Sequence, residues 1–408
     1  MSGAFLFRNR ELWAVSIASG IRSIGFGATW PFMALFFQED LHIPVYEVGI
    51  IFSLLSVGSI IFSLVGGALA DSLGRKRTLL LGSAAGSALY FAIAIGIMIR
   101  VPVTAIIAMF VLSSFGGALV FPSAGALIAD VTSIADRSKG YVVYRIMANL
   151  GWAIGPLTGS LIFNFGIFWI FLLVALSSLI QGIVVLFFVR ERGTFRKREK
   201  GSGRIQMISF DRFLLIFSAG TFLVTLVSSQ FSVTLPLYAG VKAAVPTDLI
   251  GYIYAVNGVV VVVGQYPITN FMKRYPDIVS MIAGSLAYTA GYVLVGFSTT
   301  LLQFMGDMVI ITIGENLTSP IMNTVVSRIA PEGKVARYMG FLGMVNSTGR
   351  ALGPSVGAFF IAIYAYNGLK IWSSVGAFGL ISIVAFVVFA RMISHSLQPG
   401  PQKADSSQ

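Results

Sequence analysis

The chain has 408 residues, of which 56% are hydrophobic and only 11% are charged, and its mean hydropathy is +0.86. A water-soluble protein of this size has too little polar surface to cover so much apolar material, so the composition indicates a protein whose solvent is lipid. The formal net charge is +12, but no basic soluble domain is present to bind nucleic acid. The chain has no cysteine, which excludes disulfides and thiol chemistry.

Apolar segments follow one another along the whole chain, and we expect twelve of them to cross the membrane as helices. Each is long enough to span roughly 30 Å of hydrocarbon with some tilt. The predicted fold class is therefore an all-α membrane protein. The expected segments are 11–37, 47–70, 78–99, 103–129, 139–165, 167–189, 211–239, 248–272, 277–298, 300–327, 336–364 and 368–391.

Basic residues gather on one side of this expected topology. They include the run 75–77 after the second segment and the run from Arg190 to Arg212 between the sixth and seventh. Cytoplasmic loops of membrane proteins are enriched in Lys and Arg, so we predict that both termini and the central loop are cytoplasmic. The expected location is the cell membrane, which the chain crosses many times.

Two stretches lying 198 positions apart carry the same pattern. The sequence GWAIGPLTG at 151–159 returns as GRALGPSVG at 349–357, and the same offset relates Pro122 to Pro320. Internal repeats of apolar segments are typical of transporters whose substrate path runs between the repeats. We therefore predict two related six-helix bundles.

The composition places the boundaries of these bundles. Residues 1–190 are expected to form the first bundle and 211–392 the second. Residues 191–210 are polar, basic and contain glycine, so we expect a cytoplasmic linker there. The polar residues 393–408 are expected to form a disordered cytoplasmic tail.

The turn after the second segment carries the sequence GALADSLGRKR at 67–77. This stretch resembles the signature G-x-x-x-D-R-x-G-R-K of the major facilitator superfamily, although Ser72 stands where the family has Arg. The twelve segments, the central basic loop and the duplicated halves extend the resemblance over the whole chain. The matching positions are Gly67, Asp71, Gly74, Arg75 and Lys76.

The resemblance implies that these five residues form a conformational gate. In the family the Asp meets the start of helix 11, here around Tyr338 to Gly340, and this contact locks the outward-facing state. These residue types are physically suited to that role. Gly67 permits close helix packing and Gly74 suits a turn, and the carboxylate of Asp71 can accept hydrogen bonds at the N-terminus of a facing helix, where the helix dipole favours an anion. The alternative is that the basic residues are topology signals only.

Glycines recur every four residues in the fifth segment and so lie on one face of a helix, next to a proline that bends it. This pattern resembles the antiporter motif of drug:proton exporters in the same superfamily. The alternative is generic small-residue packing, which the copy at 349–357 favours. The first segment, with Arg22 and Pro31, also resembles these exporters, whereas the Arg that many of them carry in helix 4 is missing. The motif positions are Gly151, Gly155, Pro156 and Gly159.

Five charged side chains are expected at depth in the membrane, where charges are costly and face the interior or a water-filled path. Glu315 is the predicted proton-coupling residue, with Asp307 as an outer relay and Arg22 or Arg350 as the counter-charge. One alternative is a structural ion pair between Glu315 and Arg350. Another is that Arg22 and Arg350 clamp an anionic substrate. The fifth charge is Arg145 on the fifth segment.

The expected pocket wall is apolar and aromatic, which suits hydrophobic or amphipathic compounds. No cofactor is expected besides the coupling proton. The two histidines stand alone, so no metal site is predicted. The pocket candidates are Phe26, Trp30, Asn149, Trp152 and Asn346.

These features predict a secondary active transporter that works by alternating access and exports small hydrophobic or amphipathic compounds in exchange for protons. No phosphate-binding G-x-x-x-x-G-K-[ST] motif is present, so an ATP-driven pump is excluded, and an enzyme is not expected. The alternatives left open are a uniporter or proton symporter of a small organic anion or nutrient, and a receptor or sensor with a transporter fold. The expected partners are a small-molecule substrate and the bilayer, without nucleic acid, and the expected state is a monomer.

Overall fold

The computed structural model describes residues 9–133, 136–191, 211–331 and 334–396. Almost all of the predicted linker 191–210 and most of the tail 393–408 lie outside the described residues. The helices of the first half are α2 (Arg10–Leu35) with the π-helical turn η1 (Phe36–Asp40), α3 (Val45–Leu73), α4 (Arg75–Met98), α5 (Val103–Val131), α6 (Arg137–Phe163) and α7 (Ile167–Phe188).

The second half repeats this arrangement, and its first span is broken into several short helical pieces. That span comprises α8 (Arg212–Ser228), η2 (Ser229–Phe231), α9 (Thr234–Leu237) and η3 (Tyr238–Lys242). The remaining helices are α10 (Thr247–Met272), α11 (Asp277–Val295), α12 (Leu301–Ile329), α13 (Val335–Tyr364) and α14 (Gly368–Ser396).

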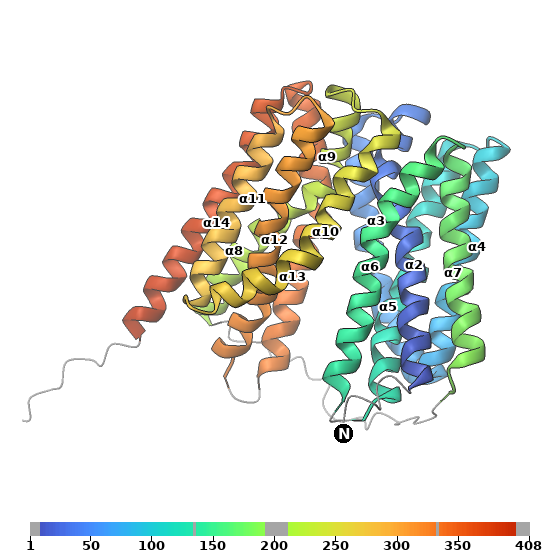
Figure 1. Ribbon diagram of the computed structural model, residues 1–408, viewed down its shortest axis with the longest axis horizontal. Helices are drawn as coiled ribbons and strands as arrows, with labels where there is room; N and C mark the ends of the chain where they lie inside the picture. The colour runs from blue at the N-terminus through green and yellow to red at the C-terminus, as the bar shows by residue number, and fades with distance from the viewer. Residues whose placement is uncertain (1–8, 134–135, 192–210, 332–333, 397–408) are drawn as a thin grey trace, which may run out of the picture.

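Figure 1 shows two helical bundles side by side, α2–α7 in one and α8–α14 in the other. The predicted fold class is confirmed, since the described residues form twelve spans and no strand. Nine spans are long and apolar enough to cross a membrane on length and composition alone, within the described ranges. The other three, α2, α12 and α13, carry four of the five predicted intramembrane charges, and these charges lower their hydropathy.

The repeated glycine motif joins equivalent helices in the two halves. In α6 its glycines face α2, where a Cβ at Gly155 would lie 2.7 Å from the Cα of Gly27. In α13 the copy faces the broken first span of its own half, where a Cβ at Gly349 would lie 3.0 Å from the carbonyl oxygen of Phe222. The motif is therefore a packing surface in both halves, as the two-bundle prediction requires.

The bundles are joined by hydrogen bonds near one end of the helices. Ser53 Oγ on α3 donates to the carbonyl oxygen of Ala351 at 2.5 Å and lies 2.7 Å from Ser355 Oγ on α13. Beyond it, Gln38 Nε2 donates to Tyr366 Oη at 2.6 Å. These contacts close the space between the bundles at the end opposite the start of α2, which is the upper end in Figure 1.

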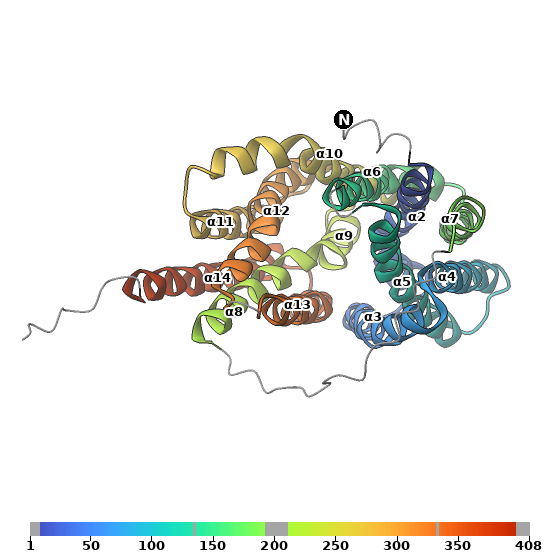
Figure 2. The same cartoon turned by 90° about the horizontal axis from the view of Figure 1, so that it is seen from below.

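The bundles stand apart at the other end, as seen from below in Figure 2. A Cβ added at Gly67 on α3 or at Gly340 on α13 would meet no atom within 4 Å. The positive-inside prediction makes this the cytoplasmic side. With that orientation, the structure is inward-facing.

The packing of α6 on α2 predicts a stability difference between two glycine-to-alanine changes. Gly155→Ala places a methyl group against the backbone of α2, so we expect a loss of about 1–3 kcal/mol. Gly125→Ala on α5 meets open space and gains up to about 1 kcal/mol of helix propensity. Unfolding in detergent measures both, and equal effects would contradict the close α2–α6 contact.

Candidate functional site

Two adjoining cavities lie between the bundles. One has a volume of about 400 Å³ and contains Glu315, and the other has a volume of about 610 Å³ and contains nine serines. We call them the glutamate lobe and the serine lobe. Four residues line both, which makes the lobes parts of one central cavity of a size that holds a drug-like ligand. The shared residues are Trp30, Ser228, Phe231 and Arg350.

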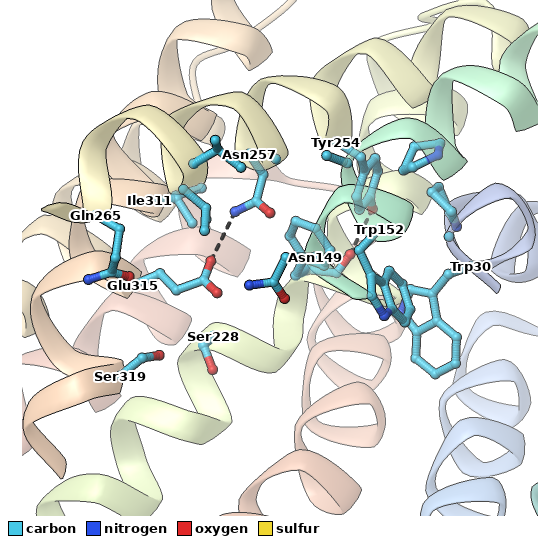
Figure 3. A pocket seen from close by; sticks show the side chains of 18 of the residues that line it. Trp30, Asn149, Trp152, Ser228, Tyr254, Asn257, Gln265, Ile311, Glu315 and Ser319 are labelled. Atoms are coloured by element: carbon cyan, nitrogen blue, oxygen red, sulfur yellow. Dashed lines mark hydrogen bonds between the residues drawn. The ribbon is translucent and has the colours of Figure 1, made fainter. Parts of the chain in front are cut away.

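Glu315 reaches the glutamate lobe from α12 and is held from α10. Asn257 Nδ2 donates to Glu315 Oε2 at 2.9 Å and to Thr312 Oγ1 at 3.0 Å. Figure 3 shows the Glu315 carboxylate directed into the cavity with Asn149 of the opposite bundle before it. Arg145, also from the opposite bundle, acts on Glu315 electrostatically. The carboxylate therefore lies where both bundles contribute polar groups.

The seam between α10 and α12 fixes this geometry. Pro320 has no N–H, so the carbonyl of Asn316 one turn earlier lacks its helical donor. Gln265 Nε2 on α10 donates to that carbonyl at 3.2 Å, and Asn316 Nδ2 donates to the carbonyl of Val260 at 3.1 Å. These bonds hold α12 against α10 next to Glu315.

Arg350 lines both lobes but is not the ion-pair partner of Glu315. Its Nη2 donates to Ser347 Oγ at 3.3 Å, one turn earlier on α13. The ion pairs found among the described residues do not include Glu315 with Arg350. The predicted structural ion pair is therefore absent in this state, and Arg145 lines the glutamate lobe together with Glu315 and Arg350.

Arg22 lies behind the wall of the serine lobe. Its guanidinium carbon is 4.2 Å from the centre of the Phe26 ring. Phe26 and Tyr90 themselves line the lobe. No described carboxylate forms an ion pair with Arg22, so its positive charge is left uncompensated beside the cavity.

The structure does not bring Asp307 to the cavity. Asp307 is buried, accepts a 2.5 Å hydrogen bond from Ser298 Oγ, and lines neither lobe. It lies eight residues from Glu315, which corresponds to about 12 Å along a helix. Its contact ties α12 to the preceding turn, and this position does not favour the predicted outer relay.

Four of the five pocket candidates line the cavity. Trp30 lies in both lobes, Phe26 in the serine lobe, and Asn149 and Trp152 in the glutamate lobe. Asn346 lines neither lobe. Its amide oxygen accepts from Thr225 Oγ1 at 3.3 Å and its Nδ2 points to the Met322 sulfur at 3.9 Å, so it packs α13 between its neighbours.

The serines of the second lobe were not predicted from the sequence. Three of them recur along α3 at intervals of three and four residues, which is the spacing of one helical face. That spacing is a signal from which the polar face could be predicted. The nine serines are Ser56, Ser59, Ser63, Ser113, Ser114, Ser228, Ser229, Ser232 and Ser347.

The structure describes the contacts of four of the five expected gate residues. Gly74 has a φ of 94° and makes the turn between α3 and α4 as expected, and Arg75 pairs with Asp130 at the end of α5. Gly67 has no close neighbour in this state, whereas a Cβ at Gly66 beside it would lie 2.8 Å from the carbonyl oxygen of Ala118, so the predicted packing of Gly67 in the outward-facing state stays a prediction. Lys76 Nζ donates to a carbonyl of α7 at 2.9 Å, and the side chain of Asp71 lies outside the described part of the structure.

Two six-helix bundles around a central cavity, in an apolar chain, define a multi-pass membrane transporter. The profile of the Major Facilitator Superfamily matches residues 15–354 and 221–407 in two overlapping matches, and the chain belongs to this family. Its fold and family are those of membrane transporters and not of enzymes. A small-molecule substrate follows from the family.

Several curated relatives match most of the chain. The MFS-type transporter YttB of Bacillus subtilis is 26% identical over 98% of this chain and all of its own length. A Na(+), Li(+), K(+)/H(+) antiporter of Planococcus maritimus is 25% identical over 85% of this chain and 88% of its own. The multidrug resistance protein MdtH of Aeromonas hydrophila is 26% identical over 85% of each chain.

Solved structures share the fold at low identity. The nucleoside transporter NupG has a TM-score of 0.75 at 15% identity and covers 94% of this chain and 98% of its own. A bacterial homolog of the human lysosomal transporter Spinster, in an inward-facing and unoccupied conformation, has a TM-score of 0.77 at 14% identity. It covers 96% of this chain and 99% of its own.

The closed and open ends of the cavity predict different reactivities for two cysteines on α3. The natural chain has none, so Ser63→Cys and Ser53→Cys each give a single thiol. Ser63 is exposed in the serine lobe, whereas Ser53 lies in the contact with α13. With a membrane-impermeant thiol reagent on inside-out vesicles, we expect Ser53→Cys to react at least about tenfold more slowly, because it requires a minor open state. Equal rates would contradict the inward-facing assignment.

Proposed function

We propose that this transporter is a proton-coupled exporter of small hydrophobic or amphipathic compounds in the cell membrane, with Glu315 as its proton-binding group. One observation carries the proposal: within the described residues, Glu315 is the single carboxylate in the walls of either lobe. It lies between the bundles, so a change of facing state changes the groups around it.

The relatives support export by exchange. One relative is named as an antiporter that exchanges protons for alkali cations, and another as a multidrug resistance protein. The glycine–proline motif at 151–159 resembles that of drug:proton exporters. The role of that motif as a packing surface in both halves explains its presence without deciding the direction of transport.

Exchange requires that substrate and proton oppose each other's binding. A ligand that stabilises the ionised carboxylate of Glu315 expels the proton, and a proton on Glu315 weakens the ligand by the same factor. If only the singly loaded carrier changes its facing state, an inward proton gradient drives the ligand outward. Asn257, Asn149 and Arg145 are the groups placed to favour the ionised carboxylate.

A second function, cotransport of an organic anion with a proton, is favoured by the charge balance of the site. Arg22, Arg145 and Arg350 stand against the one carboxylate of Glu315. An anion that pairs with Arg350 removes positive charge from the surroundings of Glu315, and the carboxyl then takes up a proton. The two functions therefore differ in the sign of the proton change on binding.

Proton release from purified protein in weak buffer tests the proposal. The panel comprises lipophilic cations, uncharged amphiphiles and organic anions. We expect compounds that bind the wild type to release protons. Glu315→Gln should abolish the release and should weaken binding as protonation does, because glutamine resembles the protonated carboxyl group. Asp307→Asn is the matched control, because Asp307 lies on the same helix outside the cavity, and it should release protons like the wild type.

The other outcomes contradict the proposal in distinct ways. Proton uptake that depends on Glu315 would establish cotransport instead of exchange. Binding without any proton change in the wild type and in Glu315→Gln would show that neither function uses Glu315. Loss of release in Asp307→Asn with retention in Glu315→Gln would move the proton site to Asp307.

A further inference from the structure

We propose, resting on the function above, that the serine lobe is the substrate site and that it selects uncharged amphipathic compounds carrying O–H or N–H donors. The lobe is the larger part of the cavity, with a volume of about 610 Å³, and it is open toward the predicted cytoplasmic end through Ser63 and Phe121. Its aromatic wall offers flat apolar surfaces for a ring or an aliphatic body. The aromatic residues are Phe26, Trp30, Phe52, Tyr90, Phe121 and Phe231.

Most serine hydroxyl groups of the lobe have their hydrogen engaged in a hydrogen bond within the chain. Seven of the nine serines already donate their hydroxyl hydrogen to a backbone carbonyl three or four residues earlier in the chain. Ser56 Oγ, for example, donates to the Phe52 carbonyl at 3.0 Å, and Ser228 Oγ donates to the Thr225 carbonyl at 3.0 Å. Ser113, Ser114 and Ser232 are buried, so the serines that can offer oxygen lone pairs to the cavity are Ser56, Ser63, Ser228 and Ser229.

Hydroxyl oxygens with free lone pairs favour ligands that have hydrogen-bond donors over ligands that have acceptors only. A hydroxyl group has one hydrogen to donate and two lone pairs to accept with. A ligand with O–H or N–H groups can use the free lone pairs while the serines keep their intrahelical bonds. A ligand with acceptors only finds no free hydroxyl hydrogen on these seven serines. It obtains a donor there only by breaking such a bond, which lowers its affinity, and is otherwise limited to the N–H groups of Arg350.

The charges around the lobe disfavour ligands that carry a permanent positive charge. Arg350 lines the lobe, Arg22 lies behind its wall, and no described carboxylate lines it. A cation there meets two guanidinium groups in surroundings of low dielectric constant, where repulsion is strong. The donors that suit this lobe are therefore those of neutral groups such as phenols, alcohols and amides.

Arg350 connects occupancy of this lobe to Glu315. Guanidinium has five N–H donors and no acceptor, so a donor-bearing ligand competes with Arg350 for the same lone pairs, including that of Ser347. Arg350 also lines the glutamate lobe, where the best acceptor is the carboxylate. A ligand that displaces Arg350 toward Glu315 stabilises the ionised carboxylate, and the proton leaves, as exchange requires.

Two compounds that differ in a hydrogen-bond donor test whether the lobe prefers donor-bearing ligands. 2-Naphthol and 2-methoxynaphthalene share one ring system, but the methyl ether lacks the donor and is more apolar. We expect 2-naphthol to bind the wild type roughly fivefold more tightly in calorimetric titrations. Non-specific partitioning into detergent or into an apolar pocket gives the opposite order, because the ether is the more apolar compound.

Variants connect this preference to the named residues. Ser56→Ala combined with Ser228→Ala removes two acceptors and should bring the two affinities to within about twofold. Ser218→Ala on α8, which lines neither lobe, is the matched control and should keep the wild-type preference. Arg350→Met should keep the preference but lose proton release on 2-naphthol binding.

Each result decides the inference separately from the proposed function. A methyl ether that binds as tightly as 2-naphthol, or an unchanged preference in the double serine variant, would overturn the inference. Proton release that depends on Glu315 with other compounds would then still support exchange. Conversely, a preference for 2-naphthol that depends on these serines, without proton release from any compound, would support the substrate site and refute the proposed coupling.

Discussion

The hydrogen bond from Asn257 to Glu315 is the constraint on which the rest of the site depends. A carboxyl group at this depth is tolerated only in a water-filled path or with partners that satisfy it. Asn257 supplies one partner from α10, and the bonds of Gln265 and Asn316 keep α10 and α12 in register beside it. Because the opposite bundle supplies Asn149 and Arg145, the surroundings of Glu315 depend on how the bundles sit against each other.

The two halves keep the same packing contacts but carry different charges at equivalent positions. The counterpart of Glu315, 198 positions earlier, is Gly117, and a Cβ there would lie 3.6 Å from a guanidinium nitrogen of Arg22. The first half thus places a cation where the second half has its carboxylate. The surface ion pairs are reversed as well, since Asp130 pairs with Arg75 and its counterpart Arg328 pairs with Asp277. Because the two halves pack alike but carry opposite charges at equivalent positions, the two lobes of the cavity differ chemically.

The helices and their arrangement in two halves could be predicted from the sequence, because they follow from hydropathy and from the internal repeat. The sequence did not predict which charges meet. Arg145 and Arg350 both lie on helices that line the cavity. Only the arrangement of the two bundles determines that Arg145 acts electrostatically on Glu315. Asp307 shares a helical face with Glu315 but lies near the helix end, where the turn at Ser298 satisfies it. The serine lobe was missed because serine is unremarkable in a membrane helix until several helices converge.

The most direct test of the account is infrared difference spectroscopy of the Glu315 carboxyl group when a donor-bearing ligand is added. The account predicts that the C=O stretching band of a protonated carboxyl disappears on ligand binding in the wild type, and that this change is absent in Glu315→Gln. A ligand that binds without changing the band, or a change that survives in Glu315→Gln, would contradict the assignment of the coupling proton to this residue.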